Sequence, residues 1–199
     1  INDSLFIGTG KFKTGRYGLA NRKGIIKTYF KFPNDGTDFS ERLKSPAYGS
    51  ELDIKPDKKK IVSSVNLGGV LEILSINNNE LHKTKDLHYY YPKYNVVNGG
   101  ESLGYAAKFY EGENKAGFTD VYATNQSIFT KYSGKKLLMS TLSTSSTGKD
   151  ILIYDWYGNP KKRYSLDYDI EYICVNEKET DLYGFTYLPE PKIVHFKLY

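Results

Sequence analysis

Short runs of β-branched and aromatic residues recur along the whole chain, and segments rich in Gly, Asn, Asp and Pro separate them. Such runs between turn-forming residues are typical of β-strands joined by tight turns. The pattern therefore predicts an all-β chain whose strands fall into four groups. We place these groups at residues 1–32, 51–89, 117–167 and 170–199.

The groups repeat one antiparallel unit of four strands. In the second group, the strands are expected at 51–55, 60–66, 70–77 and 81–89. The third strand starts near Ile151 in the third group and near Ile193 in the fourth, 42 residues later. Four strands in a period of about 40–45 residues predict the blades of a β-propeller. The first group lacks a leading strand and the last lacks a trailing one. We therefore expect one domain, 1–199, that is an incomplete part of a larger ring.

Three insertions interrupt the repeat, at 33–50, 90–116 and 134–149. Residues 39–44 are expected to form one helical turn that Pro46 ends, because proline disrupts a continuing helix. The Ser- and Thr-rich stretch 143–148 is expected to be a mobile surface loop. Long loops on a rigid scaffold usually carry binding groups, so these insertions are natural places to look for a site.

Composition narrows the function classes. The chain has 19 Tyr and 10 Phe, which suit half-buried strands, and a formal net charge of +5. Basic and acidic residues are interleaved and no nucleic-acid-binding motif is present, so no nucleic-acid partner is expected. Cys174, the single cysteine, excludes an intrachain disulfide and is expected to be a buried, inert thiol.

Nothing in the sequence resembles a membrane span or a signal peptide, and the first residue is Ile1 rather than Met. The chain is therefore expected to be a processed, trimmed or internal part of a longer protein.

Four segments in the same order resemble motifs of the TolB-like six-bladed β-propeller family, and together they span nearly the whole chain. The family's members are bacterial extracytoplasmic proteins, often lipoproteins. The resemblance implies a propeller fold, of which this chain would be the C-terminal portion, and a place in the periplasm or at the outer membrane. It implies no particular reaction, because propellers host many functions. The segments are Gly15-Arg16-Tyr17-Gly18-Leu19-Ala20-Asn21, Ile54-Lys55-Pro56-Asp57-Lys58-Lys59-Lys60 with Gly69-Val70-Leu71-Glu72-Ile73, Leu87-His88-Tyr89-Tyr90-Tyr91-Pro92-Lys93-Tyr94, and Tyr154-Asp155-Trp156-Tyr157-Gly158-Asn159-Pro160 with Lys162-Arg163-Tyr164.

No complete catalytic motif is present. The Gly-x-Ser-x-Gly motif of serine hydrolases is absent, and the three histidines lack the spacing of a zinc site. The pair Asp167 and Asp169 resembles a calcium ligand pair but is typical of a polar turn. The sequence thus predicts no catalytic residue, metal ligand or cofactor.

The most distinctive local feature is an aromatic cluster that follows the fourth strand of the second group. Its residues could stack against a sugar, a peptide or an aromatic ligand, or they could pack between blades. For Trp156, packing between blades is favoured over ligand binding more strongly than for these residues. The candidate ligand-binding residues are Tyr89, Tyr90, Tyr91, Lys93 and Tyr94.

These observations predict a non-catalytic binding or scaffold propeller of an exported bacterial protein. Its partner would be a protein, a peptide or a carbohydrate, and a lipid anchor in a missing N-terminal segment would attach it to a membrane. The alternative is a hydrolase acting on a carbohydrate or an ester, with its site at the central channel. A third hypothesis is a structural partner that completes a ring with another chain through its open blade edge.

Overall fold

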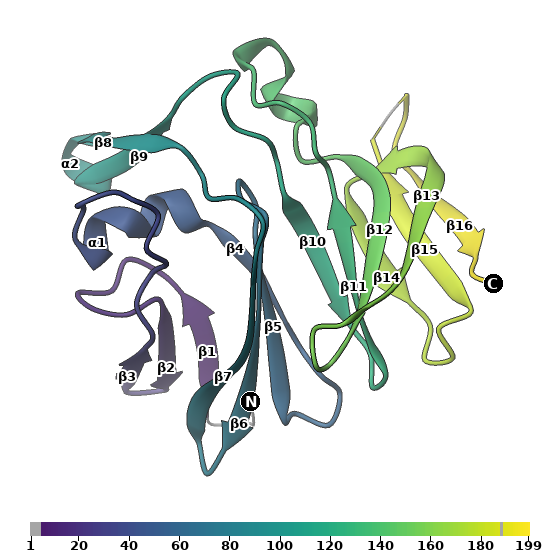
Figure 1. Cartoon of the computed structure of the whole chain (residues 1–199), viewed down its shortest axis with the longest axis horizontal. Helices are drawn as coiled ribbons and strands as arrows, with labels where there is room; N and C mark the ends of the chain where they lie inside the picture. The colour runs from purple at the N-terminus through teal and green to yellow at the C-terminus, as the bar shows by residue number, and fades with distance from the viewer. Residues whose placement is uncertain (1–4, 188) are drawn as a thin grey trace.

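The computed structural model describes residues 5–187 and 189–199, which form four antiparallel sheets and one separate hairpin (Figure 1). The sheets contain three, four, four and three strands, and within each sheet the strands follow chain order. The predicted all-β class and the four-stranded antiparallel blades are therefore confirmed.

Each sheet is built from consecutive strands, so every pairing within a sheet is a hairpin connection. The first sheet comprises β1 (Phe6–Thr9), β2 (Tyr17–Asn21) and β3 (Gly24–Tyr29). The second comprises β4 (Ser50–Ile54), β5 (Lys60–Val65), β6 (Val70–Asn77) and β7 (Glu80–His88). The third comprises β10 (Phe118–Ala123), β11 (Ser127–Tyr132), β12 (Gly148–Asp155) and β13 (Pro160–Ile170). The fourth comprises β14 (Tyr172–Val175), β15 (Asp181–Thr186) and β16 (Lys192–Lys197).

The first strands of three successive sheets lie next to one another. Strand β10 contacts β4 and β5 on one side and β14 on the other (Figure 1). The sheets thus turn their first strands towards one region and their last strands outwards, as blades do around a propeller axis.

Burial along the strands follows from this stacking of sheets. Five of the six residues of β5 are buried, because this strand has a neighbouring sheet on both faces. The outer strand β7 instead places its exposed and less exposed residues mostly in alternation. One core cluster joins Val62 and Leu71 of the second sheet to Phe118, Ile128 and Trp156 of the third sheet and its turns. Trp156, in the turn after β12, therefore packs between blades, as predicted.

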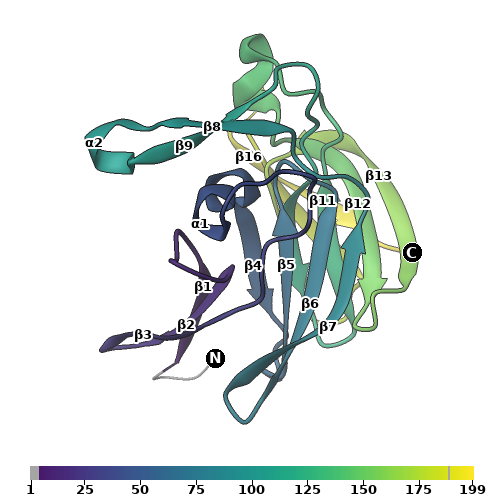
Figure 2. The same cartoon turned by 60° about the vertical axis from the view of Figure 1, so that its left-hand side comes forward.

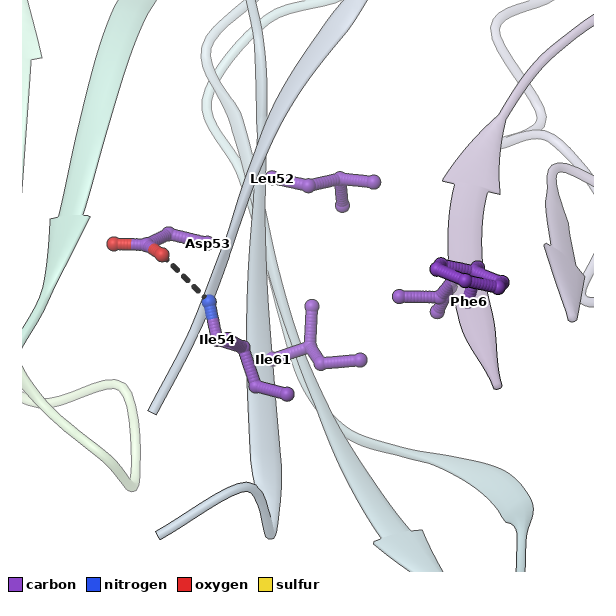
Figure 3. Close-up of a pocket in the computed structure, with 6 residues that line it drawn as sticks. Phe6, Leu52, Asp53, Ile54 and Ile61 are labelled. Carbon is purple, nitrogen blue, oxygen red and sulfur yellow. Dashed lines mark hydrogen bonds between the residues drawn. The ribbon is translucent and has the colours of Figure 1, made fainter. Parts of the chain in front are cut away.

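The seam between the first two sheets has an apolar core and a pocket of about 240 Å³. In Figure 3, Leu52 and Ile54 of β4 point towards Phe6 of β1, whereas Asp53 points away from it. The alternation of side chains along β4 thus supplies apolar groups to one seam and a carboxylate to the other.

The insertions contain more regular structure than the sequence predicted. Residues 33–50 contain α1 (Glu41–Lys44), and Pro46 does not end the helical segment there, because it lies within the 3-10 helix η1 (Ser45–Tyr48). A missing N–H is tolerated in a first helical turn.

The second insertion forms a hairpin that extends over α1, away from the sheets (Figure 2). The third contains a 3-10 helix and buried side chains at Ser145 and Thr147, so it is not a loop throughout. The elements of these two insertions are β8 (Tyr94–Asn98), α2 (Gly100–Leu103), β9 (Tyr105–Phe109) and η2 (Met139–Thr144).

Across residues 5–187 and 189–199, no helix has the length and apolar character needed to cross a membrane.

Candidate functional site

Tyr89 and Tyr90, the first two residues of the predicted aromatic cluster, face the third sheet. The Tyr89 ring lies 6.2 Å from that of Phe118, and its hydroxyl is 3.4 Å from the Tyr154 hydroxyl, although 60% of Tyr89 is exposed. Tyr90 donates a hydrogen bond to the Tyr132 hydroxyl at 3.3 Å, and burial raises the pKa of Tyr90. These two rings therefore take part in the contact between neighbouring sheets.

Tyr91 and Lys93 make polar contacts near the surface. The Tyr91 hydroxyl lies 2.9 Å from Nδ1 of His88. The Lys93 ammonium pairs with Glu113 at 3.1 Å, and both of these side chains are more than half exposed. An exposed pair of this kind contributes little to stability, so both groups remain accessible to a ligand.

Tyr94 is buried and belongs to a different cluster. Its hydroxyl donates a hydrogen bond to Asp35 at 3.0 Å, and Tyr48 donates to the same carboxylate at 2.9 Å. Burial alone would raise the pKa of Asp35, but hydrogen bonds from Lys44, Thr37 and Tyr48 lower it to about 2. The structure therefore does not gather the five predicted residues on one surface.

A buried carboxylate, Glu72, is the centre of a second polar network. Arg16 and Tyr17 both donate to its Oε2, and Lys83 Nζ lies 2.5 Å from its Oε1. Burial acts to raise the pKa of Glu72, but the neighbouring Arg16 and Lys83 cations hold it below its usual value. The two cations compensate the buried carboxylate. The network therefore forms part of the contact between the first two sheets.

The same carboxylate belongs to a group with the spacing of metal ligands. Oxygen or nitrogen atoms of Glu72, Asp86 and His88 lie within 4.8 Å of one another. Lys83 Nζ, however, contacts both carboxylates, at 2.5 Å from Glu72 and 3.1 Å from Asp86. An ammonium group already compensates this pair, so the arrangement is better explained as an ion-pair network.

A pocket of about 170 Å³ lies where the first strands of three sheets begin. We call it the axial pocket, and its principal lining residues are Glu51, Thr119, Ser146, Glu171 and Tyr172. Glu51 lies on β4, Thr119 on β10 and Tyr172 on β14. The axial pocket thus draws side chains from the second, third and fourth sheets, far apart in sequence.

Hydrogen bonds orient the polar side chains of the axial pocket. Glu51 accepts from Asn66 Nδ2 at 3.2 Å, and Glu171 accepts from the Ser146 hydroxyl at 2.8 Å. The Thr119 hydroxyl donates to the Ser146 carbonyl at 2.7 Å. These contacts hold two carboxylates beside Tyr172, which is 56% exposed.

Two charged groups with shifted pKa values lie close to the axial pocket. Lys131 is fully buried and its Nζ donates to the Glu171 carbonyl. Burial lowers the pKa of Lys131, although the carboxylates of Asp120, Glu171 and Glu51 act in the opposite direction. Burial raises the pKa of Asp120 to about 6, against backbone N–H donors and the Lys131 charge. Opposed shifts of this kind are frequent at functional sites, and structural ion-pair networks also produce them.

The chemistry of the axial pocket suits a ligand that donates hydrogen bonds. Carboxylates accept from amines and hydroxyls, and a tyrosine ring can stack on a sugar or cover an alkyl chain. Sequence reasoning did not single out Glu51 or Glu171. The available signal was their position at the start of the first strand of a unit, because first strands line a propeller axis.

Taken together, four successive antiparallel sheets with apolar seams, three of them with adjoining first strands, define a β-propeller fold. The chain belongs to the TolB-like 6-blade propeller-like family, whose model matches residues 1–178. The resemblance seen in the sequence is thereby confirmed.

One solved structure with a similar chain course is the WD40 domain of Pan2 from Neurospora crassa. The two are 10% identical, with a TM-score of 0.33, and the similarity covers the whole of this chain. The chain spans 64% of the length of that domain. A comparison with curated proteins gave no match.

Proposed function

We propose that this chain is the ligand-binding part of a non-catalytic propeller and that the axial pocket holds the ligand. The convergence of Glu51, Thr119, Glu171 and Tyr172 from three sheets supports this proposal most strongly. Pockets that combine a few oriented polar groups with an aromatic side chain are typical of ligand sites.

The ligand is a peptide or protein segment that presents an amine. Two carboxylates converge on the axial pocket, and the nearby Lys131 charge is buried and directed at a backbone carbonyl. A lysine side chain would place its ammonium group between Glu51 and Glu171 and its alkyl stem against Tyr172. A carbohydrate would use the same carboxylates as acceptors for its hydroxyl groups.

Titration calorimetry with a short lysine-containing peptide, its acetyl-lysine counterpart and a glucose oligosaccharide tests the ligand class. We expect the lysine peptide to bind and acetylation to remove binding. Glu51→Gln and Glu171→Gln should each weaken binding about tenfold, because each removes a charge-assisted hydrogen bond. Glu177→Gln is the matched control, since exposed Glu177 follows the other end of β14. Binding of the oligosaccharide alone would reassign the ligand to carbohydrates.

The alternative function is a hydrolase acting on a carbohydrate or an ester. The raised pKa of Asp120 and the lowered pKa of Lys131 favour it. Asp120 and Lys131, however, both form hydrogen bonds to backbone atoms around β14. These hydrogen bonds occupy the side-chain atoms that would have to transfer protons. Nitrophenyl esters and glycosides provide the test, and turnover that is lost in Asp120→Asn would establish the hydrolase.

Two exposed residues of the aromatic cluster offer a second candidate surface. Tyr89 and Lys93 are its two most exposed members, and we propose that they contact the outer part of a bound ligand. Lys93→Ala should then weaken peptide binding without changing the free energy of unfolding by more than a few tenths of a kcal/mol. Tyr89→Ala should also weaken binding, but it should lower stability as well, because the Tyr89 ring packs against Phe118.

The remaining features of the proposal concern the whole protein. Family membership supports a six-bladed ring, of which this chain forms part, and an exported protein with an N-terminal lipid anchor in the periplasm or at the outer membrane. Cell fractionation tests the location, and the intact mass of the native protein tests the larger ring and the lipid anchor. A mass near 22.7 kDa without lipid would contradict them.

A further inference from the structure

A second pocket lies in the seam between the first and second sheets, where β1 ends and β4 begins. Its volume is about 220 Å³, enough for a small ligand or several water molecules. We call it the Arg16 pocket. Its lining includes Lys11, Arg16, Phe32, Ser45, Tyr48 and Gly49.

Arg16 supplies an unsatisfied donor at this pocket. Its side chain is 1% exposed, its Nη1 contacts Glu72, and its Nη2 donates to the Ser50 hydroxyl at 3.0 Å. Its Nε has no acceptor within residues 5–187 and 189–199. A guanidinium group stays protonated in proteins, and a buried N–H without an acceptor is costly. The unsatisfied N–H is therefore best explained by an acceptor that the described part of the chain does not supply.

The charges around the Arg16 pocket favour an anion. Lys11 and Arg16 line it, and the described lining residues include no carboxylate. Glu72 is shared between Arg16 and Lys83, so it does not fully neutralise either cation. The Lys11 ammonium donates to the Tyr105 carbonyl at 2.9 Å, which holds its charge beside the second insertion.

We propose that the Arg16 pocket binds a small anion through a carboxylate or phosphate group. One anion oxygen accepts the Arg16 Nε–H, and the Lys11 ammonium adds electrostatic attraction. The rings of Phe32 and Tyr48 line the same pocket and leave room for an apolar part of the ligand. This site is separate from the axial pocket, whose charged lining is acidic, so neither proposal depends on the other.

Nitrogen-15 NMR observes the proposed contact directly. The chain has four arginines, Arg16, Arg22, Arg42 and Arg163, so their Nε–H signals can be assigned by single Arg→Lys variants. Inorganic phosphate and acetate are the probes, each titrated at low salt. We expect the Arg16 Nε–H signal to shift and saturate with at least one of them. The relative affinities then show whether the site prefers phosphate or carboxylate.

Lys11→Gln should weaken binding about tenfold, because it removes one charge from the anion's surroundings. Lys13→Gln makes the same change two residues away, outside the pocket lining, and should leave affinity unchanged. Gly49→Leu tests whether filling the Arg16 pocket blocks the anion. A Cβ at Gly49 meets no heavy atom within 4 Å, so the side chain can be accommodated and should weaken anion binding. An Arg16 Nε–H signal that neither probe moves, or equal affinities for Lys11→Gln and Lys13→Gln, would overturn the proposal.

Discussion

Asp53 Oδ2 accepts a hydrogen bond from the backbone N–H of Ala123 at 2.6 Å, which ties β4 to β10 across a seam between sheets. Asp120 repeats the arrangement one sheet further on, because its Oδ2 accepts the N–H of Ile173 on β14 at 2.7 Å. In both cases the other carboxylate oxygen accepts the N–H of the following residue. First strands of different sheets share no ladder, so these carboxylates satisfy backbone donors that the seams would otherwise bury.

Removing either carboxylate should therefore destabilise the fold. Asp53→Ala and Asp120→Ala each leave a backbone N–H of a buried residue without its acceptor, which costs about 1–3 kcal/mol. Urea unfolding followed by circular dichroism measures the change. Asp38→Ala, at an exposed position, serves as the control and should change stability by less than about 0.5 kcal/mol. Equal stability of all three variants would show that the two hydrogen bonds contribute nothing.

The same geometry makes stability depend on pH through Asp120. Burial raises the pKa of Asp120 from 3.8 to about 6 in the folded state, so folding favours its protonated form. The contribution is fully present below about pH 3.8 and is lost as the pH rises through about 6. It amounts to about 3 kcal/mol, most of which is lost between pH 4 and pH 7.

Comparison of the wild type with Asp120→Asn isolates this contribution from those of other groups. The difference in free energy of unfolding, wild type minus variant, should fall by about 2 kcal/mol between pH 4 and pH 7. A difference that stays constant over this range would show that the Asp120 pKa is not raised.

Glu72 tests the buried network between the first two sheets. Glu72→Gln leaves the buried Arg16 and the partly buried Lys83 without their shared carboxylate, so we expect a loss of about 3–5 kcal/mol. Glu80→Gln breaks an exposed pair with Lys27 and is the matched control, for which little change is expected. A loss no larger than that of the control would mean that water reaches the Glu72 network.

The sequence predicted the fold well because a propeller repeats one local pattern. Strands, turns and the blade-sized period are all local features, and each unit reinforces the interpretation of the others. The β8–β9 hairpin was not predicted, because the apolar stretch at Val96 and Val97 is short and lies among Tyr, Gly and Asn residues.

Cys174 shows where local reasoning was wrong. It lies among apolar residues and was expected to be buried, but the thiol is exposed. On β14 the exposed residues Tyr172 and Cys174 alternate with the buried Ile173 and Val175. An apolar run therefore identifies a strand without identifying which of its faces meets a neighbour.

The candidate sites could be predicted least. The axial pocket joins Glu51 to Glu171, and the Arg16 pocket depends on the pairing of Arg16 with Glu72, 56 residues away. Such contacts arise when sheets stack, and no motif of fixed spacing encodes them. Tyr89 and Tyr94 were grouped because they are close in sequence, but packing places one at the surface and the other in the interior.

Gly117 provides the sharpest steric test of the seam between the second and third sheets. Its backbone N–H donates to the Asn66 carbonyl at 2.7 Å, and a Cβ at this position would lie 2.0 Å from the Gly68 carbonyl oxygen. Because that oxygen belongs to backbone, the two sheets would have to move apart to accept even alanine. We expect Gly117→Ala to lower stability by about 1–3 kcal/mol, measured by urea unfolding. Gly8→Ala is the control, since a Cβ there meets no heavy atom within 4 Å. If Gly117→Ala proved as stable as Gly8→Ala, the two sheets would not approach each other as closely as this seam requires.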